Sequence, residues 1–227
     1  MFVAGVDGYR EGWVGFCVEL PSKVTTVEAI DLCGWLGRRP EGLVAMGIDV
    51  PIGLLDGARA CDRAARKILG QPRGSSVFSP PCRSAIRSKT YAEACEANYS
   101  GVGRKISRQA WGIAKKIREV DDVMMAEAQT WAFEVHPEVC FWALSGCCPM
   151  RHGKKTADGR AERLLLIRSI FSDIDVHLAQ RPQHVGIDDV LDAAAAAWTA
   201  LRHSEGRAKQ VCNPETDPLG LMATIWY

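Results

Sequence analysis

Residues 2–20, FVAGVDGYREGWVGFCVEL, hold two runs of β-branched and aromatic side chains on either side of a glycine-containing turn. Two such runs around a short turn predict an antiparallel β-hairpin. The first run ends in Asp7. A third, weaker strand is predicted over residues 23–32, followed by a short helix through Trp35 and Leu36. The chain is therefore expected to begin with three antiparallel strands.

A second stretch, GLVAMGIDV at residues 42–50, is almost wholly apolar. Such a run is typical of a strand that is buried on both faces of a parallel sheet. It ends in Asp49, and Pro51 cannot continue the hydrogen-bond ladder. Residues 130–135, TWAFEV, predict another strand, and LGLMATIWY at 219–227 predicts a last one.

Helices are predicted between these strands wherever apolar residues recur at helical spacing. The strongest pattern is GIDDVLDAAAAAWTALRH at residues 186–203. Two stretches, 70–83 and 149–159, are rich in glycine, proline or polar residues and predict loops. The other helices are expected at 59–69, 90–99, 107–128, 136–146 and 160–171.

This order of elements predicts the fold class. Three antiparallel strands followed by parallel strands with helices between them is the ribonuclease H topology. We therefore predict an α/β protein with a ribonuclease H-like mixed sheet flanked by helices. The length of 227 residues suits a single domain over 1–227, with a helical insertion at about 59–130.

The composition excludes several classes of protein. Hydrophobic residues make up 47% and charged residues 24% of the chain, which is ordinary for a globular protein and unlike disordered, collagen-like or coiled-coil chains. No apolar run approaches the ~20 residues of a membrane span, and no signal peptide is evident. The nine cysteines are scattered and odd in number, which predicts a reducing cytoplasm. The adjacent Cys147 and Cys148 could be redox-active or inert.

Charged residues are unevenly distributed. Residues 59–118 contain fourteen lysines and arginines but only three acids, a net charge of +11, whereas the rest of the chain carries −10. A basic region beside an acidic body is typical of a protein that binds a polyanion, so nucleic acid is the predicted partner. The alternative is a solvated helical surface, although such a surface normally mixes the two signs.

Acidic side chains stand at the ends of predicted elements. Asp7 ends the first strand, Asp49 ends the fourth, and Asp188, Asp189 and Asp192 begin the late helix. If the two strands are parallel neighbours, Asp7 and Asp49 emerge at one sheet edge, where open α/β sheets place their sites. Carboxylates within ~5 Å repel by roughly 3–4 kcal/mol per pair at an effective dielectric constant near 20. We therefore predict that Asp7, Asp49, Asp189 and Asp192 bind Mg²⁺ or Mn²⁺.

Two such ions about 4 Å apart suit in-line attack of water on a phosphodiester. Each acid also has a purely structural interpretation. Asp7 and Asp49 could be turn residues at strand ends. Asp188 and Asp189 could be first-turn acids that the helix dipole stabilises. Asp192 lies beyond the first turn, so the dipole explains it least.

Further candidates lie near the predicted strands and loops. Glu134 and His136 could supply a ligand, a general base or a proton shuttle, or be an ion-paired glutamate and a core histidine. Because Arg binds phosphate bidentately, the predicted phosphate contacts are Arg63, Arg66, Arg83 and Ser76. The aromatic residues that could stack on bases, or simply fill the core, are Trp13, Phe78, Trp111 and Trp131. There is no P-loop, GxSxG motif or dinucleotide fingerprint.

Several motifs resemble a bacterial protein family in the same order along nearly the whole chain. They are GVDGYREGWV, GIDVPIGL, RACDRAARKILG, RGSSVFSPPCR, FEVHPEVCFWALSG, DDVLDAAAAAW and LGLMATIWY. In these motifs the chain is similar to domain-of-unknown-function family 429, described as predicted nucleases of ribonuclease H-like fold. The resemblance implies that fold and a metal-binding acidic centre.

The stretch DDVLDAAAAAW is also similar to the final helix of RuvC-type Holliday-junction resolvases, in which two aspartates three residues apart precede an alanine-rich stretch. By this similarity Asp7 corresponds to their first-strand aspartate, and Asp189 and Asp192 to the helix pair. Asp49 stands where those resolvases use glutamate, so its shorter side chain shifts the metal position.

Three functions are compatible with these sequence patterns. The leading prediction is a Mg²⁺- or Mn²⁺-dependent nuclease that hydrolyses DNA or RNA by a two-metal carboxylate mechanism. The alternative is a catalytically inactive module of the same fold that binds nucleic acid or nucleotides. A third is a phosphotransferase of the acetate and sugar kinase, heat-shock and actin group, because GVDG resembles its first phosphate-binding hairpin. The chain is short for the two domains that this group usually has.

Overall fold

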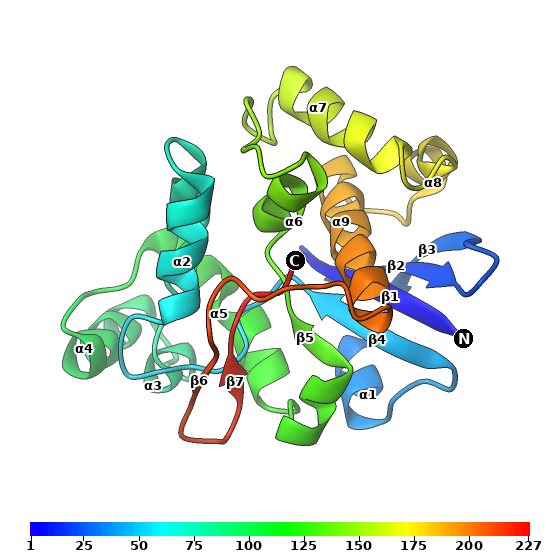
Figure 1. Cartoon of the computed structure of the whole chain (residues 1–227). Helices are drawn as coiled ribbons and strands as arrows, with labels where there is room; N and C mark the ends of the chain where they lie inside the picture. Colours follow the sequence, from blue (N-terminus) through cyan, green and yellow to red (C-terminus); the bar gives the residue numbers. More distant parts are fainter.

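The computed structural model describes residues 1–227 and contains a five-stranded mixed sheet of order β3-β2-β1-β4-β5. The strands are β1 (Phe2–Tyr9), β2 (Gly12–Glu19), β3 (Thr25–Ile30), β4 (Leu43–Ile48) and β5 (Ala132–Glu134). The first three pair antiparallel, and β4 lies parallel to both β1 and β5. With helices on both faces this is a ribonuclease H-like fold (Figure 1), which confirms the predicted fold class.

Eleven helical segments surround this sheet. The α-helices are α1 (Leu32–Gly37), α2 (Ala60–Leu69), α3 (Arg83–Ile86), α4 (Tyr91–Val102), α5 (Arg108–Asp121), α6 (Pro137–Leu144), α7 (Ala157–Arg168), α8 (Ile174–Gln180) and α9 (Ile187–Ser204). Two 3₁₀ helices are η1 (Arg73–Ser76) and η2 (Ala126–Thr130). Side-chain caps fix where α4, α5 and α7 begin, because the hydroxyls of Thr90, Ser107 and Thr156 accept first-turn N–H groups.

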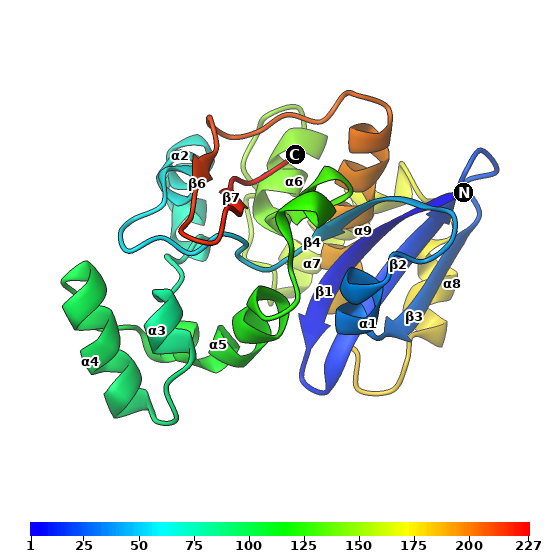
Figure 2. The same ribbon diagram turned by 90° about the horizontal axis from the view of Figure 1, so that it is seen from below.

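The two faces of the sheet carry separate cores. Side chains alternate along a strand, so Val3 and Ala45 pack with α9, α6 and α7, whereas Ala4 and Met46 pack with α1 and α5. Figure 2 shows α1 on one side of the sheet and α9 with α8 on the other. Helix α9 is therefore the element that determines what lies over one face of β1 and β4.

Helices α2 to η2 lie between β4 and β5 in the chain, and α3, α4 and α5 extend away from β3 (Figure 2). Two ion pairs, one of them fully buried, join this basic segment to the sheet and the C-terminal region. Arg59, 1% exposed, binds Glu134 of β5 at 2.5 Å. Arg83 binds Asp217 near the C-terminus. Part of the positive charge of residues 59–118 thus stabilises the fold through internal ion pairs.

Some elements differ from the sequence prediction. The helix predicted over 107–128 ends at Asp121, and η2 follows it after a turn; Asp121 and Asp122 at this end bind Arg83 and Arg87. The loop at 70–83 contains η1, and α8 was not predicted. At the C-terminus only Met222–Ala223 (β7) forms a strand, paired with Glu215–Thr216 (β6) in a separate two-stranded sheet.

All nine cysteines are free thiols. None of the helices combines the length and the apolar character that crossing a bilayer would require.

Candidate functional site

The same pattern, glycine–apolar–aspartate, occurs near the C-terminal ends of β1 and β4. The sequence predicted that Asp7 ends the first strand, but β1 continues to Tyr9 because Gly8 and Tyr9 still pair with β2, whereas Asp49 directly follows β4. Gly5 and Gly47 are partners in the parallel register, and the strands continue from them to Asp7 and Asp49. The backbone N–H of Asp49 still donates to the carbonyl of Val6 at 2.9 Å. Because side chains two residues apart point to one face, both aspartates face the side that α9 covers.

The two glycines let α9 approach the sheet closely. A Cβ on Gly5 would lie 2.0 Å from the carbonyl oxygen of Ala193, and one on Gly47 would lie 2.9 Å from that of Ala196. Only glycine fits at the first of these distances. Asp192 precedes the contact residues of α9 and is 1% exposed, so close packing brings its carboxylate down onto the strand ends.

Three carboxylates converge as a result. Oxygen atoms of Asp7, Asp49 and Asp192 all lie within 4.8 Å of one another. The backbone N–H of Gly8 donates to Asp7 Oδ1 at 2.7 Å and fixes the orientation of that side chain. The structure thus brings together three of the four acids that the sequence predicted as metal ligands.

The surroundings disfavour three negative charges. Burial, followed by the charge of Asp192, raises the pKa of Asp49 to about 7. Burial and the charge of Asp49 raise the pKa of Asp7 well above its ordinary value. Burial likewise raises the pKa of Asp192. A positive charge among these groups would therefore be strongly stabilised.

Lys154 supplies one such charge. Its Nζ donates to Asp192 Oδ2 at 2.6 Å, although its side chain is 42% exposed. The charge of Asp192 is the main reason that the pKa of Lys154 is raised. Sequence analysis did not identify this residue, because Lys154 belongs to a polar loop whose course no periodic pattern fixes.

The donor set fits a hard divalent cation. It consists of carboxylate oxygens, without thiol or imidazole groups within the cluster, and such oxygens favour Mg²⁺ or Mn²⁺ over zinc. One ammonium group leaves two of the three carboxylate charges unbalanced. Asp7, Asp49 and Asp192 are therefore the residues that would hold the ion.

Asp189 and Asp188 lie at the beginning of α9, outside the cluster. Asp189 Oδ2 accepts the N–H of Gly186 at 2.8 Å, although its side chain also lines the hollow above the cluster. Asp188 binds Arg160 at 2.9 Å on the surface. Both placements match the first-turn interpretation that the sequence left open.

Glu134 and His136 stand beside the cluster with other roles. Glu134 accepts the N–H of Ile52 at 2.7 Å and binds Arg59, so it is an ion-paired glutamate. Burial, and then the charge of Lys154, lowers the pKa of His136 to about 4. Its Nδ1 is buried without a partner. His136 is thus a neutral imidazole close to Lys154.

The predicted phosphate contacts lie in different environments. Arg83 is engaged by Asp121 and Asp217, and Ser76 donates to the carbonyl of Arg73. Arg63 is exposed and donates to the carbonyl of Ala58 at 2.6 Å. Arg66 donates to Val77 O and Ser79 Oγ. The structure gives Arg83 internal acceptors and leaves Arg63 and Arg66 without ion pairs.

A hollow of about 220 Å³ opens above the cluster. We call it the acidic pocket, and its lining residues include Asp7, Asp49, Trp13, Phe78, Ile113, Lys116 and Lys154. Lys116 donates to the carbonyl of Gly12 at 2.6 Å and lies 4.4 Å from the centre of the Trp13 ring. Two lysines therefore line the same small, partly aromatic hollow as Asp7 and Asp49.

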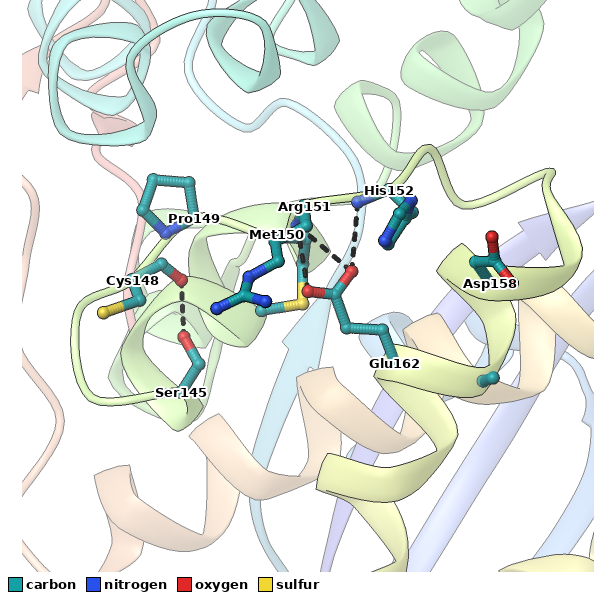
Figure 3. A pocket seen from close by; sticks show the side chains of 9 residues that line it. Ser145, Cys148, Pro149, Met150, Arg151, His152, Asp158 and Glu162 are labelled. Carbon is teal, nitrogen blue, oxygen red and sulfur yellow. Dashed lines mark hydrogen bonds between the residues drawn. The ribbon is translucent and has the colours of Figure 1, made fainter.

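A larger hollow of about 620 Å³ lies over the loop that leads to Lys154 (Figure 3). None of the three clustered acids lines it. Glu162 of α7 accepts the N–H groups of Arg151 and His152 at 2.9 and 3.1 Å. This carboxylate fixes the backbone just before Lys154. Glu162, which lines the hollow, therefore helps to position the lysine.

The fold and the three converging acids define an α/β protein of ribonuclease H-like architecture with an acidic centre. A family model described as "Protein of unknown function (DUF429)" matches residues 5–217, and the chain belongs to this family. The matched residues include all three acids and Lys154. No curated protein and no solved structure matches the chain significantly.

Proposed function

We propose that this protein is a Mg²⁺- or Mn²⁺-dependent hydrolase of phosphodiester bonds in nucleic acid. The observation that carries the proposal is the convergence of Asp7, Asp49 and Asp192 within 4.8 Å at one edge of the sheet. A divalent cation bound there would act as a Lewis acid on water and on a phosphate oxygen.

The chain itself supplies positioning and charge. Asp7 and Asp49 lie where they would hold the ion, and Asp192 is held by Lys154. Lys154 and Lys116 line the pocket, where their positive charges would attract a phosphate anion even though Lys116 also lies 3.7 Å from Glu119. Because burial lowers the pKa of His136 to about 4, its imidazole is neutral at pH 7 and does not serve as an imidazolium acid. Lys154 is then the cationic group beside the acids.

The two-ion version predicted from the sequence needs ligands beyond the three clustered acids. Asp189 lines the acidic pocket and is the acid available to a second ion. It would have to exchange its hydrogen bond from Gly186 for the metal.

One observation favours the inactive binding module as a second candidate. The ion pair between Lys154 and Asp192 already balances part of the acidic centre without metal. Such a centre could attract a phosphate group without cleaving it.

The two candidates differ in turnover. Labelled single- and double-stranded DNA and RNA are incubated with the protein in Mg²⁺, in Mn²⁺ and in chelator. The hydrolase predicts cleavage that chelator abolishes and that Asp7→Asn and Asp49→Asn each lower by at least about 10²-fold. Asp188→Asn, which alters a surface ion pair, is the control and retains activity. Binding without cleavage in either metal would reject the hydrolase and favour the module.

A further inference from the structure

A separate hollow of about 360 Å³ lies in the helical segment between β4 and β5. We call it the basic pocket. It is lined by Arg66, Phe78, Ser79, Pro80, Asn98, Arg104, Lys105, Ile106, Ser107 and Ala110. Three of these residues are cations and none is an acid, so the pocket is suited to an anion.

The three cations of the basic pocket are free of ion pairs within the protein. Arg66 donates through Nε to Val77 O at 2.7 Å and through Nη2 to Ser79 Oγ at 2.6 Å. These bonds fix its guanidinium plane and leave Nη1 without an acceptor. Arg104 and Lys105 are exposed and form no salt bridge. A negatively charged ligand would supply these three cations with an ion-pair partner and Arg66 Nη1 with a hydrogen-bond acceptor.

The walls of the basic pocket are held by a buried amide. Asn98 is 2% exposed, accepts the N–H of Cys82 at 2.8 Å and donates to the carbonyl of Arg104 at 2.7 Å. Ser107 caps α5 by accepting the N–H of Ala110 at 3.0 Å. The segment bearing Arg104 and Lys105 is therefore anchored at both ends before any ligand binds, which lowers the entropic cost of binding.

The basic pocket adjoins the acidic pocket. Phe78 is the one residue that lines both. Helix α5 runs under both, because Ala110 lines the basic pocket and Ile113 lines the acidic pocket. Three residues of α-helix span about 4.5 Å. Only an aromatic ring and less than one helical turn separate the two hollows.

We propose that the basic pocket binds a phosphate of a nucleic acid strand, next along the chain from the phosphate that occupies the acidic pocket. Phe78 then lies beside the nucleoside that joins the two phosphates, where aromatic rings stack on bases without sequence preference. This inference rests on the proposed function for the identity of the strand. The inference goes beyond that function in two ways. It assigns a second phosphate subsite to Arg66, Arg104 and Lys105, and it predicts that a single strand crosses the protein over Phe78.

A second basic hollow provides a matched control. It measures about 500 Å³, includes Lys89, Lys115 and Arg118, and shares no lining residue with the acidic pocket. Lys89 and Lys115 are exposed, as Arg104 and Lys105 are, although Lys115 also lies 3.8 Å from Glu119. Removing either pair changes the net charge equally, but only Arg104 and Lys105 belong to the basic pocket.

The test compares nucleotides with one and two phosphates by calorimetry in Mg²⁺. Thymidine 3′,5′-bisphosphate contains no phosphodiester, so it reports binding independently of cleavage; the two thymidine monophosphates are the references. The native protein is expected to prefer the bisphosphate by about tenfold or more, the equivalent of one added charge-assisted contact. Arg104→Ala/Lys105→Ala loses this preference, whereas Lys89→Ala/Lys115→Ala keeps it.

The subsite is overturned if the bisphosphate binds no tighter than the monophosphates, if neither binds, or if both double variants lose the preference equally. Failure of the proposed hydrolysis gives a different result. A protein that cleaves nothing, yet loses the bisphosphate preference only in Arg104→Ala/Lys105→Ala, has the subsite without the activity. Cleavage of single strands that is unaffected in this variant would also reject the subsite.

Discussion

Two aspartates of α9 that are three residues apart have different environments. Asp192 is buried beside two other carboxylates and Lys154, whereas Asp189 caps the N-terminus of α9 by accepting the N–H of Gly186. The same substitution at the two positions therefore separates the metal site from the helix cap. Asp192→Asn is expected to lower Mn²⁺ affinity by at least about tenfold, because one anionic ligand is lost.

Asp189→Asn is the companion variant, since an asparagine oxygen can still accept the Gly186 N–H. Its Mn²⁺ affinity is expected to stay within about threefold of native by calorimetry. A larger loss for Asp189→Asn than for Asp192→Asn would show that the helix pair binds metal as the resolvase similarity implied.

Lys154 and a bound cation act on the same carboxylates, so they oppose each other. Lys154→Met removes one positive charge beside Asp192 and should raise Mn²⁺ affinity, by about tenfold for a charge at this separation. In chelator the same variant should unfold at a lower temperature, because Asp192 is left buried without its partner. Weaker Mn²⁺ binding in Lys154→Met would mean that the lysine helps to form the site.

The stability of the metal-free protein should depend on Asp49 in a definite direction. Its pKa is about 7 in the folded protein and near 3.8 when unfolded. Between these values the folded state binds more protons than the unfolded state, so the free energy of unfolding falls as pH rises. The Tm in chelator should therefore decrease more from pH 5 to pH 8 for the native protein than for Asp49→Asn.

Saturating Mn²⁺ should remove most of that difference, because the cation replaces the protons as the balancing charge. Equal pH dependence of native protein and Asp49→Asn in chelator would contradict the prediction. The comparison of the two proteins cancels titrating groups that are remote from the cluster, such as Asp217, whose pKa is lowered, against the opposing effect of burial, by its bond from Arg83. Asp7 is not cancelled, because the charge of Asp49 contributes to its raised pKa.

The sequence could locate the three acids but could not locate Lys154. Asp7 and Asp49 lie near the ends of strands whose apolar patterns are unambiguous, and Asp192 belongs to the strongest predicted helix. Lys154 reaches the cluster only because its loop is fixed by Glu162, eight residues further along the chain. No periodicity encodes such a contact.

At the scale of elements, the glycine pair of β1 and β4 carries the site. Gly5→Ala places a Cβ 2.0 Å from backbone atoms of Ala193 and Ala197, so α9 must move away from the sheet. We expect a loss of about 3 kcal/mol or more, a Tm lower by about 6–12 °C, and weaker Mn²⁺ binding as Asp192 withdraws.

Gly112→Ala is the matched control, because nothing lies within 4 Å of the added Cβ on α5. It should raise stability by about 0.5–1 kcal/mol through helix propensity. A Gly5→Ala protein with native Tm and native Mn²⁺ affinity would show that α9 does not need this close contact.

Other elements were harder to predict, because tertiary contacts override local patterns there. The apolar repeat continues past Asp121, yet α5 ends there, where Asp121 binds Arg83 and Arg87. The apolar C-terminal stretch reads as one strand, but Trp226 instead makes single bridges to Val135 and Gln210. In both places the partner lies far away in sequence.

At the scale of the whole molecule, the basic segment is less free than its composition implies. Five of its fourteen cations are in ion pairs, and these are Arg59, Arg83, Arg87, Lys115 and Lys116. Of the acids in these pairs only Asp62 lies within residues 59–118; the others are Glu119, Asp121, Asp122, Glu134 and Asp217. The charge available to a polyanion is therefore carried mainly by the other nine residues.

This division predicts how binding of single-stranded nucleic acid depends on salt. Each phosphate contact contributes about −0.7 to the slope of log affinity against log salt concentration, so nine free cations limit the slope to about −6. Arg104→Ala/Lys105→Ala should reduce its magnitude by about 0.7–1.4. Arg87→Ala should leave the slope unchanged, because Asp121 and Asp122 already balance that charge.

Anisotropy titrations of a labelled oligonucleotide in chelator measure the affinity of all three proteins without cleavage. Equal slopes for the two variants would show that the strand does not bind at the basic pocket. An affinity that does not depend on salt would show that the protein does not bind nucleic acid through its cations.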